Sequence, residues 1–486
     1  VEHYRAALEE NPRDPIIWEN LGQAYEKLQQ LDKAEEAYLQ GLQYETEDPA
    51  LHNRLGLLYD SQGKWDQALT HYASAARLAP EVGNYHYNQG IAHVFLGHAS
   101  QAAEAFRKAA ELKPDDPKVF NQLGNTCYDL QQWKEAAEAY QKALAIEPAN
   151  PQFLANLAVT QARLEDRDGA EATYQRLLPI APDFYNLYGN FLLDQGELEK
   201  ARDAYQKAIE KNDPLPVYYE NLGYTEQMLE KYEKAKEAFE KALELDPSYA
   251  AAYNRLGNLY FFLGDFGQAL PWYKKALEHG PKEVVFWTNL GLTYSQLERW
   301  DEALNAYQSA ADLELRNGKH YFDMGMLQFN RQQYTSAVDF LTKAIEIEPQ
   351  AIYYDGLGRC FQELEDYPAS IDYFEKALEL DPDNDVYYTR IGISQTRMQN
   401  HQLALEYYEK SIALNAAAAI YRENIGLALE ALDRPEEALS AYQKAMELDP
   451  EDGRYPNRIG IFYYNRGEYK RAAEFFRKAT TCTLIE

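Results

Sequence analysis

The chain has 486 residues, 46% of them hydrophobic, and a formal net charge of −30 at pH 7. This acid excess excludes nucleic acids and anionic membrane surfaces as partners, because phosphate binding depends on neutralisation by lysine and arginine. No stretch approaches the roughly twenty apolar residues that would span a bilayer, so we expect no direct membrane insertion. The first residues do not contain a basic segment followed by an apolar one, so the sequence shows no signal peptide.

Cysteine usage points to a reducing compartment. The three cysteines, Cys127, Cys360 and Cys482, are odd in number and far apart, which argues against a disulfide framework or a metal or redox pair. The cytoplasm is therefore slightly favoured over the periplasm, where many proteins also lack disulfides.

The first fourteen residues have the pattern of the second helix of a repeat whose first helix is absent. Tyr4 and Pro12 occur where the columns described below predict an aromatic residue and a proline. There is no initiator methionine, and no polar capping helix follows Ala479, although solenoids normally need one. We therefore expect the chain to be a segment of a larger protein or a processed form of one.

From Pro15 onward, one small residue, which we call the anchor, returns about every thirty-four residues. The fourteen anchors are Gly22, Gly56, Gly90, Gly124, Ala158, Gly189, Gly223, Gly257, Gly291, Gly325, Gly358, Gly392, Gly426 and Gly460. An alanine follows twelve residues after each anchor, except at Ser370, and an aromatic residue follows four residues later, except at Leu341. Three columns in constant register predict a solenoid.

Each unit has the pattern of two amphipathic helices. Around the first anchor, Trp18, Leu21, Gly22 and Tyr25 have the three- and four-residue spacing of one helix face. A polar break over residues 29–32 separates them from a second such helix, and a proline closes the second helix in many units. The small anchors should mark a close approach of two helices, and the aromatic residues should fill the space between neighbouring units.

This pattern resembles the tetratricopeptide repeat, with Trp287, Leu290, Gly291, Tyr294 and Ala303 repeating it nearly letter for letter. The resemblance implies an all-α fold, a right-handed α-α superhelix of about fourteen repeats. It also implies that the first helix of each unit lines a concave groove. Partner binding rather than catalysis is the function expected of such an array, and we expect no enzymatic activity and no cofactor.

The period slips twice. The step from Ala158 to Gly189 is three residues short, and the step from Gly325 to Gly358 is one residue short. A change of curvature near residues 178–190 is one interpretation of the first slip, and a merely tighter loop is the other. We accordingly divide the chain into a truncated repeat at 1–14, repeats 1–5 at 15–182, repeats 6–10 at 183–350 and repeats 11–14 at 351–486.

The expected groove is close to neutral. At the six first-helix positions that would line it, fourteen units hold twelve acidic and eleven basic residues. The negative charge therefore belongs to the outer faces and loops, where a solvated surface is the ordinary explanation. Such a groove does not select for a strongly basic ligand.

Amide side chains recur two residues before the anchor. They are Asn20, Asn88, Asn156, Asn221, Asn289 and Asn424, with Gln122 at the same position. An asparagine can match both the C=O and the N–H of a peptide unit, so a row of them could hold an extended backbone. This resembles the asparagine ladder of O-linked N-acetylglucosamine transferases. The alternative is a site that favours a polar residue bonding the adjacent helix.

Aromatic residues late in the first helices are a second candidate feature. They are Phe95, Tyr128, Phe261, Phe262, Phe329 and Tyr464. Exposed aromatics anchor partner side chains, although most aromatics at helical spacing belong to the core. Phe261 and Phe262 are adjacent and cannot both face one interior. With Asn254, Arg255, Asn258 and Asn289 they form the expected local hot spot.

Other sites are disfavoured. A two-carboxylate clamp for chaperone tails needs lysine and asparagine where Thr389 and Ile393 stand. His86, His93 and His98 form the only histidine cluster that we identify, and the first two occupy core columns, so a zinc site with about four ligands is not expected. No phosphate-binding or dinucleotide glycine pattern is present beyond the repeat glycines.

The sequence thus predicts a protein–protein interaction scaffold that binds an extended peptide or partner protein in its groove. One alternative is a self-assembling scaffold subunit, in which the ends or the convex face mediate homo-oligomerisation. The other is the substrate-recruiting arm of a larger enzyme such as a glycosyltransferase. The sequence does not identify the partner.

Overall fold

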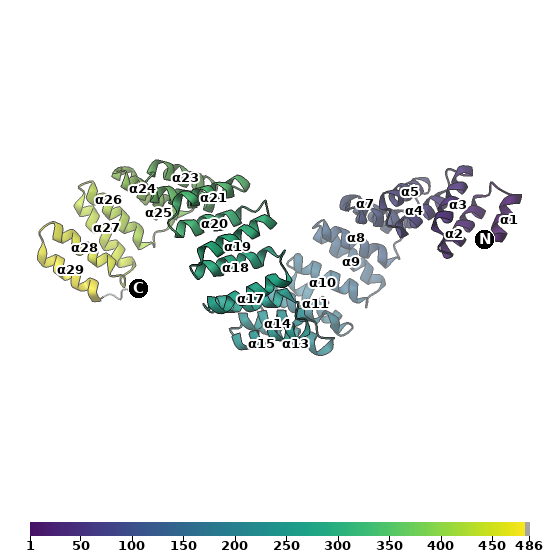
Figure 1. Cartoon of the computed structure of the whole chain (residues 1–486), viewed down its shortest axis with the longest axis horizontal. Coiled ribbons are helices and arrows are strands. Elements are labelled where there is room, and N and C mark those ends of the chain that lie inside the picture. The colour runs from purple at the N-terminus through teal and green to yellow at the C-terminus, as the bar shows by residue number, and fades with distance from the viewer. Residues whose placement is uncertain (482–486) are drawn as a thin grey trace. The chain divides into compact units, whose positions relative to one another are not determined.

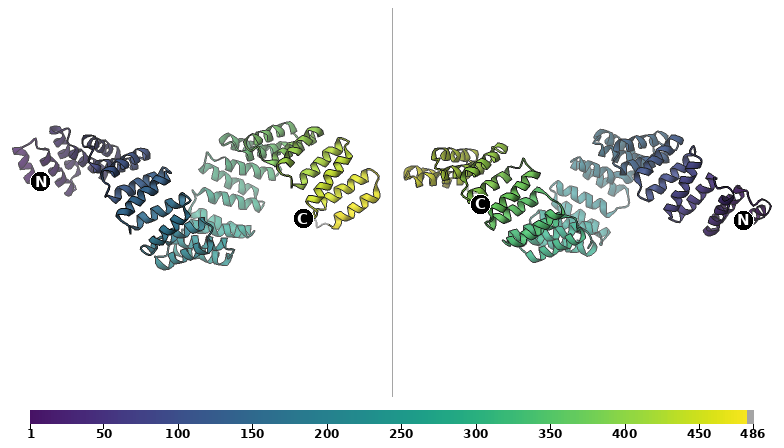
Figure 2. Two further views of the ribbon diagram at one scale, coloured as in Figure 1. Left: turned by 180° about the vertical axis from the view of Figure 1, so that it is seen from behind. Right: turned by 90° about the horizontal axis from the view of Figure 1, so that it is seen from above.

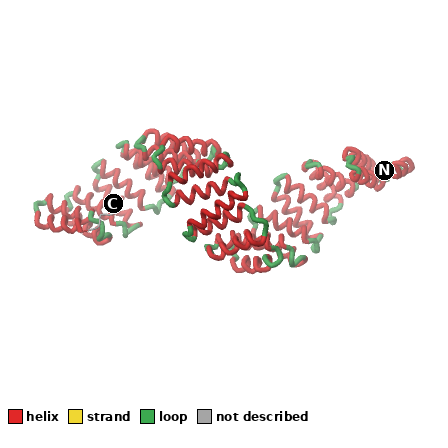
Figure 3. Tube along the Cα trace, turned by 60° about the horizontal axis from the view of Figure 1, so that its bottom comes forward, coloured by secondary structure: helices red, strands yellow, loops and turns green. Residues whose placement is uncertain are grey.

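The computed structural model describes residues 1–481, which form twenty-nine α-helices and one short 3-10 helix. No strand occurs in this range, and loops of a few residues join the helices (Figure 3). Successive helices form hairpins, such as α20 (Gly318–Asn330) with α21 (Tyr334–Ile347), as Figures 1 and 2 show from three directions. The all-helical solenoid of about fourteen repeats is therefore confirmed.

The chain forms two compact units, residues 1–242 and 243–486, and the division falls inside α15. The helices up to that division are α1 (Glu2–Glu10), α2 (Pro15–Lys27), α3 (Leu31–Tyr44), α4 (Pro49–Ser61), α5 (Trp65–Leu78), α6 (Gly83–Phe95), α7 (Ala99–Leu112), α8 (Pro117–Asp129), α9 (Trp133–Ile146), α10 (Pro151–Arg163), α11 (Arg167–Leu177), η1 (Pro182–Phe184), α12 (Tyr185–Asp194), α13 (Leu198–Lys211), α14 (Pro216–Met228) and α15 (Tyr232–Leu245).

The second unit continues the same alternation. Besides α20 and α21, its helices are α16 (Ala250–Phe262), α17 (Phe266–His279), α18 (Val284–Gln296), α19 (Trp300–Leu313), α22 (Ala351–Glu363), α23 (Tyr367–Leu380), α24 (Asp385–Arg397), α25 (His401–Leu414), α26 (Ala419–Ala431), α27 (Pro435–Leu448), α28 (Arg454–Asn465) and α29 (Tyr469–Thr481). Even-numbered helices are the first helices of the hairpins.

Four first helices begin where an acidic or amide side chain caps a proline-initiated turn. The Asp14 carboxylate accepts the Ile16 N–H at 3.0 Å, directly before Pro15. Asp48 and Asn150 do the same before Pro49 and Pro151. The cap satisfies a backbone donor that the helix leaves unpaired, and proline loses nothing in the first turn.

The turn inside each hairpin uses a left-handed residue seven positions after the anchor. In five repeats this residue is glycine, as at Gly264, and in nine it is Gln, Glu or Asp, as at Glu298 with φ 55°. The next N–H then bonds back into the last turn of the first helix, as from Arg299 to the Tyr294 carbonyl at 2.9 Å. This C-terminal cap ends the first helix at a fixed position in every repeat.

The core of each hairpin depends on the contact between the anchor and the aromatic residue sixteen positions later. A Cβ added at Gly257 would lie 2.6 Å from the Tyr273 ring. Tyr273 itself is almost fully buried, as is Ala269 four residues before it. Glycine therefore lets the two helices close onto the ring, which confirms the predicted close approach.

The aromatic column packs in two places. As predicted, its rings contact the following repeat, since Tyr174 meets Phe191 and Tyr442 meets Phe462 with ring centroids 5.3 and 6.3 Å apart. They also lie against the glycine anchor of their own hairpin, as Tyr38 does against Gly22. The two residues are sixteen apart along one helical hairpin, so the contact forms inside the repeat. At the exceptional position, Leu341 fills the same place against Gly325.

The two register slips have different structural origins. The three residues missing after Ala158 come from the second helix, because α11 has eleven residues where most second helices have fourteen. The 3-10 helix η1 then leads into a first helix, α12, of only ten residues. The single missing residue before Gly358 comes from the three-residue link between α21 and α22. The grouping of repeats at 182/183 and 350/351 stays a prediction.

Replacing Gly257 by alanine is expected to lower the free energy of unfolding by about 1–3 kcal/mol, because the Tyr273 ring must move to admit the new Cβ. Gly267→Ala in α17 is the control. Its nearest neighbour, the Asp265 carboxylate, would be 3.7 Å from the Cβ, so alanine there should stabilise by about 0.5–1 kcal/mol. Chemical denaturation measures both, and equal effects would contradict the role of the anchor.

Replacing Glu298 by glycine is expected to raise the free energy of unfolding by about 0.5–1 kcal/mol, because glycine adopts the left-handed backbone without a Cβ clash. Glu298→Ala removes the same carboxylate but keeps the Cβ, so it should give no gain. Thermal unfolding of the two variants compares them. A gain shared by both would assign the effect to charge instead.

Candidate peptide-binding surface

The asparagines of the expected ladder bond to the preceding repeat. The Asn289 Nδ2 on α18 donates to the Asn254 Oδ1 at 2.9 Å and the Asn258 Oδ1 at 3.1 Å, both on α16. We call the residue two positions before the anchor the backward residue, and the residue three positions before it the forward residue. Asn289 is thus a backward residue that contacts the forward residue Asn254.

The same arrangement recurs at two other joints between repeats. The Asn156 Nδ2 donates to Asn121 at 3.0 Å and to Asn125 at 3.1 Å. The Asn221 Nδ2 donates to Asn186 at 3.0 Å and to Asn190 at 3.2 Å. A simpler form joins Asn88 to Asn53 at 2.8 Å.

A buried tyrosine completes each three-asparagine cluster. The Tyr273 hydroxyl donates to the Asn258 Oδ1 at 2.8 Å, and Tyr140 and Tyr205 donate to Asn125 and Asn190 at the same distance. Each of these tyrosines is the ring that packs on the anchor glycine. The core of one hairpin is therefore hydrogen-bonded to the first helix of the next, and burial raises the pKa of these tyrosines.

Arginine occupies the backward position at other joints, where it meets a carboxylate. The Arg54 Nε lies 3.1 Å from the Glu19 Oε1, and the Arg458 Nε lies 3.0 Å from the Glu423 Oε1. The Arg390 Nη1 lies 3.0 Å from the Asp355 Oδ1. Burial raises the pKa of Asp355, and the nearby Arg390 opposes this shift. The basic residues that interrupt the ladder thus replace an amide pair by an ion pair.

These contacts leave part of the predicted lining available to a partner. The Oδ1 atoms of Asn221 and Asn289 accept no hydrogen bond within residues 1–481. Asn20 and Asn424 are partly buried and make no side-chain hydrogen bond in the same range. The lining therefore offers acceptors more than donors. The asparagine column thus bonds to the adjacent first helix, as one of our two interpretations predicts. The other interpretation, that the column binds an extended peptide, stays a prediction.

The two adjacent phenylalanines of the expected hot spot have different environments. Phe261 meets the Phe266 ring edge-on, with the ring centroids 5.0 Å apart, and packs on the core of its repeat. Phe262 is 65% exposed. Phe95 occupies the corresponding position of another repeat and is 61% exposed. Its ring stacks on the Trp65 ring, with the two centroids 3.9 Å apart.

The remaining aromatics of that set contact the second helix of their own hairpin. Tyr128 meets Trp133, Phe329 meets Tyr334 and Tyr464 meets Tyr469, each edge-on at 4.7–5.5 Å. In each case the partner is five residues further along the chain. Tyr128 and Phe329 are partly buried by this contact, whereas Tyr464 is 58% exposed.

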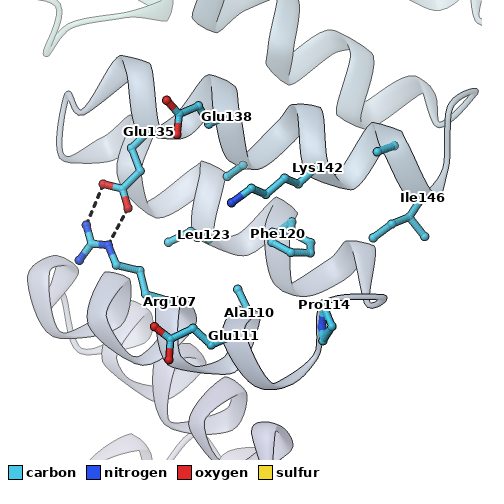
Figure 4. Close-up of a pocket in the computed structure, with 12 residues that line it drawn as sticks. Arg107, Ala110, Glu111, Pro114, Phe120, Leu123, Glu135, Glu138, Lys142 and Ile146 are labelled. Carbon is cyan, nitrogen blue, oxygen red and sulfur yellow. Dashed lines mark hydrogen bonds and ion pairs between the residues drawn. The ribbon is translucent and has the colours of Figure 1, made fainter.

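Two cavities lie elsewhere, beside the second helices. One of about 630 Å³ lies where α7, α8 and α9 meet, with Phe120, Leu123 and Ala110 among its apolar lining residues and the Arg107–Glu135 ion pair at its edge (Figure 4). One of about 510 Å³ occupies the corresponding place among α1, α2 and α3, beside Trp18. Neither cavity was predicted, because the expected binding positions all lie on first helices.

A histidine pair in the second repeat was also missed, so it was wrong that His86, His93 and His98 form the only cluster. The Nδ1 atoms of His52 and His71 are 3.0 Å apart, and Tyr59 stacks on His71. Burial, with a smaller effect of His52, lowers the pKa of His71 to about 4. The repeat pattern could have predicted this pair, because other repeats hold two aromatic residues in contact at the same two columns, as Tyr253 and Trp272 are.

Metal-binding and redox features are limited. Within residues 1–481 no group of three or more His, Cys, Asp or Glu side chains is arranged to hold a metal ion. Cys127 and Cys360 are buried free thiols whose pKa values burial raises, and Cys482 lies outside the described residues. No helix in the described part of the chain has the length and apolar character needed to cross a membrane.

Family models place this architecture among known repeats. One model described as "Tetratricopeptide repeat" matches residues 53–117, 179–216, 288–352, 389–453 and 431–483, which together are more than half of the chain. Related models match residues 3–36, 124–165, 215–282 and 356–384. A comparison with curated protein sequences gave no match.

Solved structures with similar folds include the following three. The APC/C hetero-tetramer Cut9–Hcn1 is 16% identical with a TM-score of 0.40, over 96% of this chain and 93% of that chain. Yeast Tom70 is 18% identical with a TM-score of 0.39, over 90% and 92%. Part of a repeat protein from Cytophaga hutchinsonii is 21% identical with a TM-score of 0.43, over 50% and 99%. Similarity at this level does not identify a partner.

Acidification is expected to destabilise the second repeat through His71. Its pKa in the folded chain, about 4, is below the usual value of 6.5, so the unfolded chain takes up the proton first and stability falls as the pH drops from 6.5 towards 4. His71→Gln should remove about 1–2 kcal/mol of the loss between pH 7.5 and pH 5. Denaturation at the two pH values tests this, with His3→Gln at an exposed site as control. An unchanged pH dependence in His71→Gln would refute it.

Proposed function

We propose, on the premise that this chain belongs to the tetratricopeptide repeat family, that it is an interaction scaffold holding an extended segment of a partner protein along its first helices. The proposal concerns the surface formed by the even-numbered helices, considered within each compact unit by itself. Arrays of this kind use the face formed by successive repeats as an extended binding surface.

The observation that carries the proposal is the combination of large exposed aromatic rings with amide carbonyls on one face. Phe262 and Asn289 lie on consecutive first helices, α16 and α18, and Phe95 lies at the end of α6. A mostly exposed phenylalanine loses apolar contact with water when a partner covers it. The Asn289 Oδ1 supports binding of a backbone N–H from an extended chain.

Charge pairing along this face supports a guest of mixed or neutral composition. Arg54, Arg390 and Arg458 are each within about 3 Å of a carboxylate, and the Lys319 ammonium lies 2.8 Å from Asp323. A charged guest would have to compete with these intramolecular pairs. Apolar side chains on the partner therefore supply the specificity, with the backbone bonded to amides.

The test is selection of peptides from a random display library against the chain, followed by affinity measurement on selected peptides. Phe262→Ala should weaken peptides bound by the second unit about tenfold, as expected for an exposed aromatic anchor. Asn221→Ala and Asn289→Ala should each weaken peptides bound beside them. Asn305→Ala, at an exposed position on the second helix α19, is the matched control.

The outcomes separate the proposal from its rivals. If the library yields no peptide, or if selected peptides bind the Phe262, Asn221 and Asn289 variants as tightly as the native chain, the first-helix face is not the binding surface. Peptides that bind the variants equally but compete with each other would direct attention to the cavities beside the second helices.

A further inference from the structure

The forward and backward residues follow a matching rule across repeat joints. Seven pairs are in contact, and in each the two residues are thirty-five positions apart in the sequence. The pairs are Glu19–Arg54, Asn53–Asn88, Asn121–Asn156, Asn186–Asn221, Asn254–Asn289, Asp355–Arg390 and Glu423–Arg458. We call this set the seam. Within these seven pairs amide meets amide and carboxylate meets guanidinium. Three joints of regular spacing hold other residues at the two positions, namely Tyr87 with Gln122, Thr288 with Asp323 and Thr389 with Asn424.

The matching does not arise from copying one motif along the array. The second repeat carries Asn53 as its forward residue and Arg54 as its backward residue. Arg54 pairs back to Glu19, and Asn53 pairs forward to Asn88. The two adjacent residues of one repeat therefore have different chemistry, and each matches a different neighbour.

Burial explains why a mismatch is costly. The forward residues Asn254, Asp355 and Glu423 are 7–8% exposed. A buried polar group without a partner loses its hydrogen bonds to water, and a buried charge without a partner costs more. A repeat with a buried forward carboxylate is therefore stable only when the following repeat places a guanidinium within hydrogen-bonding distance of it.

The two joints of irregular spacing lack polar seam residues. Ala155 and Leu187 face the joint where three residues are missing, and Phe322 and Gly356 face the joint where one is missing. At the second of these, the Phe322 ring instead stacks on Tyr353 at 5.0 Å. A change in spacing at either place leaves no buried carboxylate or amide unpaired.

We propose that the seam is a pairing code, in which the forward residue at each of these seven joints specifies the neighbour that follows it and fixes the register of the joint. The apolar joints at Ala155–Leu187 and Phe322–Gly356 are the places where the register changes. This inference goes beyond partner binding, because it concerns which repeats stack on which. It also gives the asparagine column a role that needs no guest.

The test converts one amide joint into an acid–arginine joint. Asn254→Glu alone and Asn289→Arg alone should each mismatch the joint between α16 and α18. Each should raise hydrogen-exchange rates of the amides in these helices about tenfold, the effect expected for losing a partly buried polar pair. The double variant should return to within about twofold of the native rates, as the native Glu423–Arg458 joint indicates.

Matched controls keep the result interpretable. Asn305→Glu and Asn305→Arg introduce the same side chains at an exposed site of α19 and should leave the rates of α16 and α18 unchanged. The charge-reversed double variant, Glu423→Arg with Arg458→Glu, should likewise be protected better than either single variant. Single variants without effect, or a double variant as disturbed as the sum of the singles, would overturn the code. Because no guest is present, neither outcome depends on peptide binding.

Discussion

The fold depends on one contact, the approach of a buried aromatic ring to the anchor of its own hairpin. At Gly22, Gly257 and Gly426 an added Cβ would lie 2.2–2.6 Å from the ring sixteen residues later. This contact sets the distance between the two helices of a repeat. Since the same tyrosines also donate hydrogen bonds towards the first-helix face, as Tyr273 does to Asn258, the core position determines where the polar lining stands.

The polar lining holds neighbouring repeats together through amide N–H groups such as the Asn289 Nδ2. In the function that we propose, different atoms of the same side chains, the carbonyl oxygens, bind another polypeptide. A binding surface built from structural residues is rigid, and a rigid surface loses little conformational entropy when a guest binds. The cost is that substitutions in the lining disturb stacking as well as recognition, so binding and stability have to be measured together.

Much of the architecture could be predicted from the sequence because the repeat is defined by local spacing. The helix pairs, the buried alanine column and the close approach at the anchors follow from residues less than twenty positions apart. The packing of aromatic rings between repeats was predicted, but the contact of each such ring with the glycine anchor of its own hairpin, as between Tyr38 and Gly22, was not. The pair His52 and His71 was missed, although other repeats hold an aromatic pair in the same two columns.

The sequence by itself determined the repeat, its number, its period and the positions where the period slips, because these are properties of short periodic patterns. Only the tertiary structure decided what the asparagine column contacts. Asn289 and Asn254 are thirty-five residues apart, and whether two such amides bond to each other depends on how one hairpin stacks on the next. That stacking fixes heights and angles that no local pattern encodes, so the matching of amide with amide and acid with arginine became visible only in the folded array.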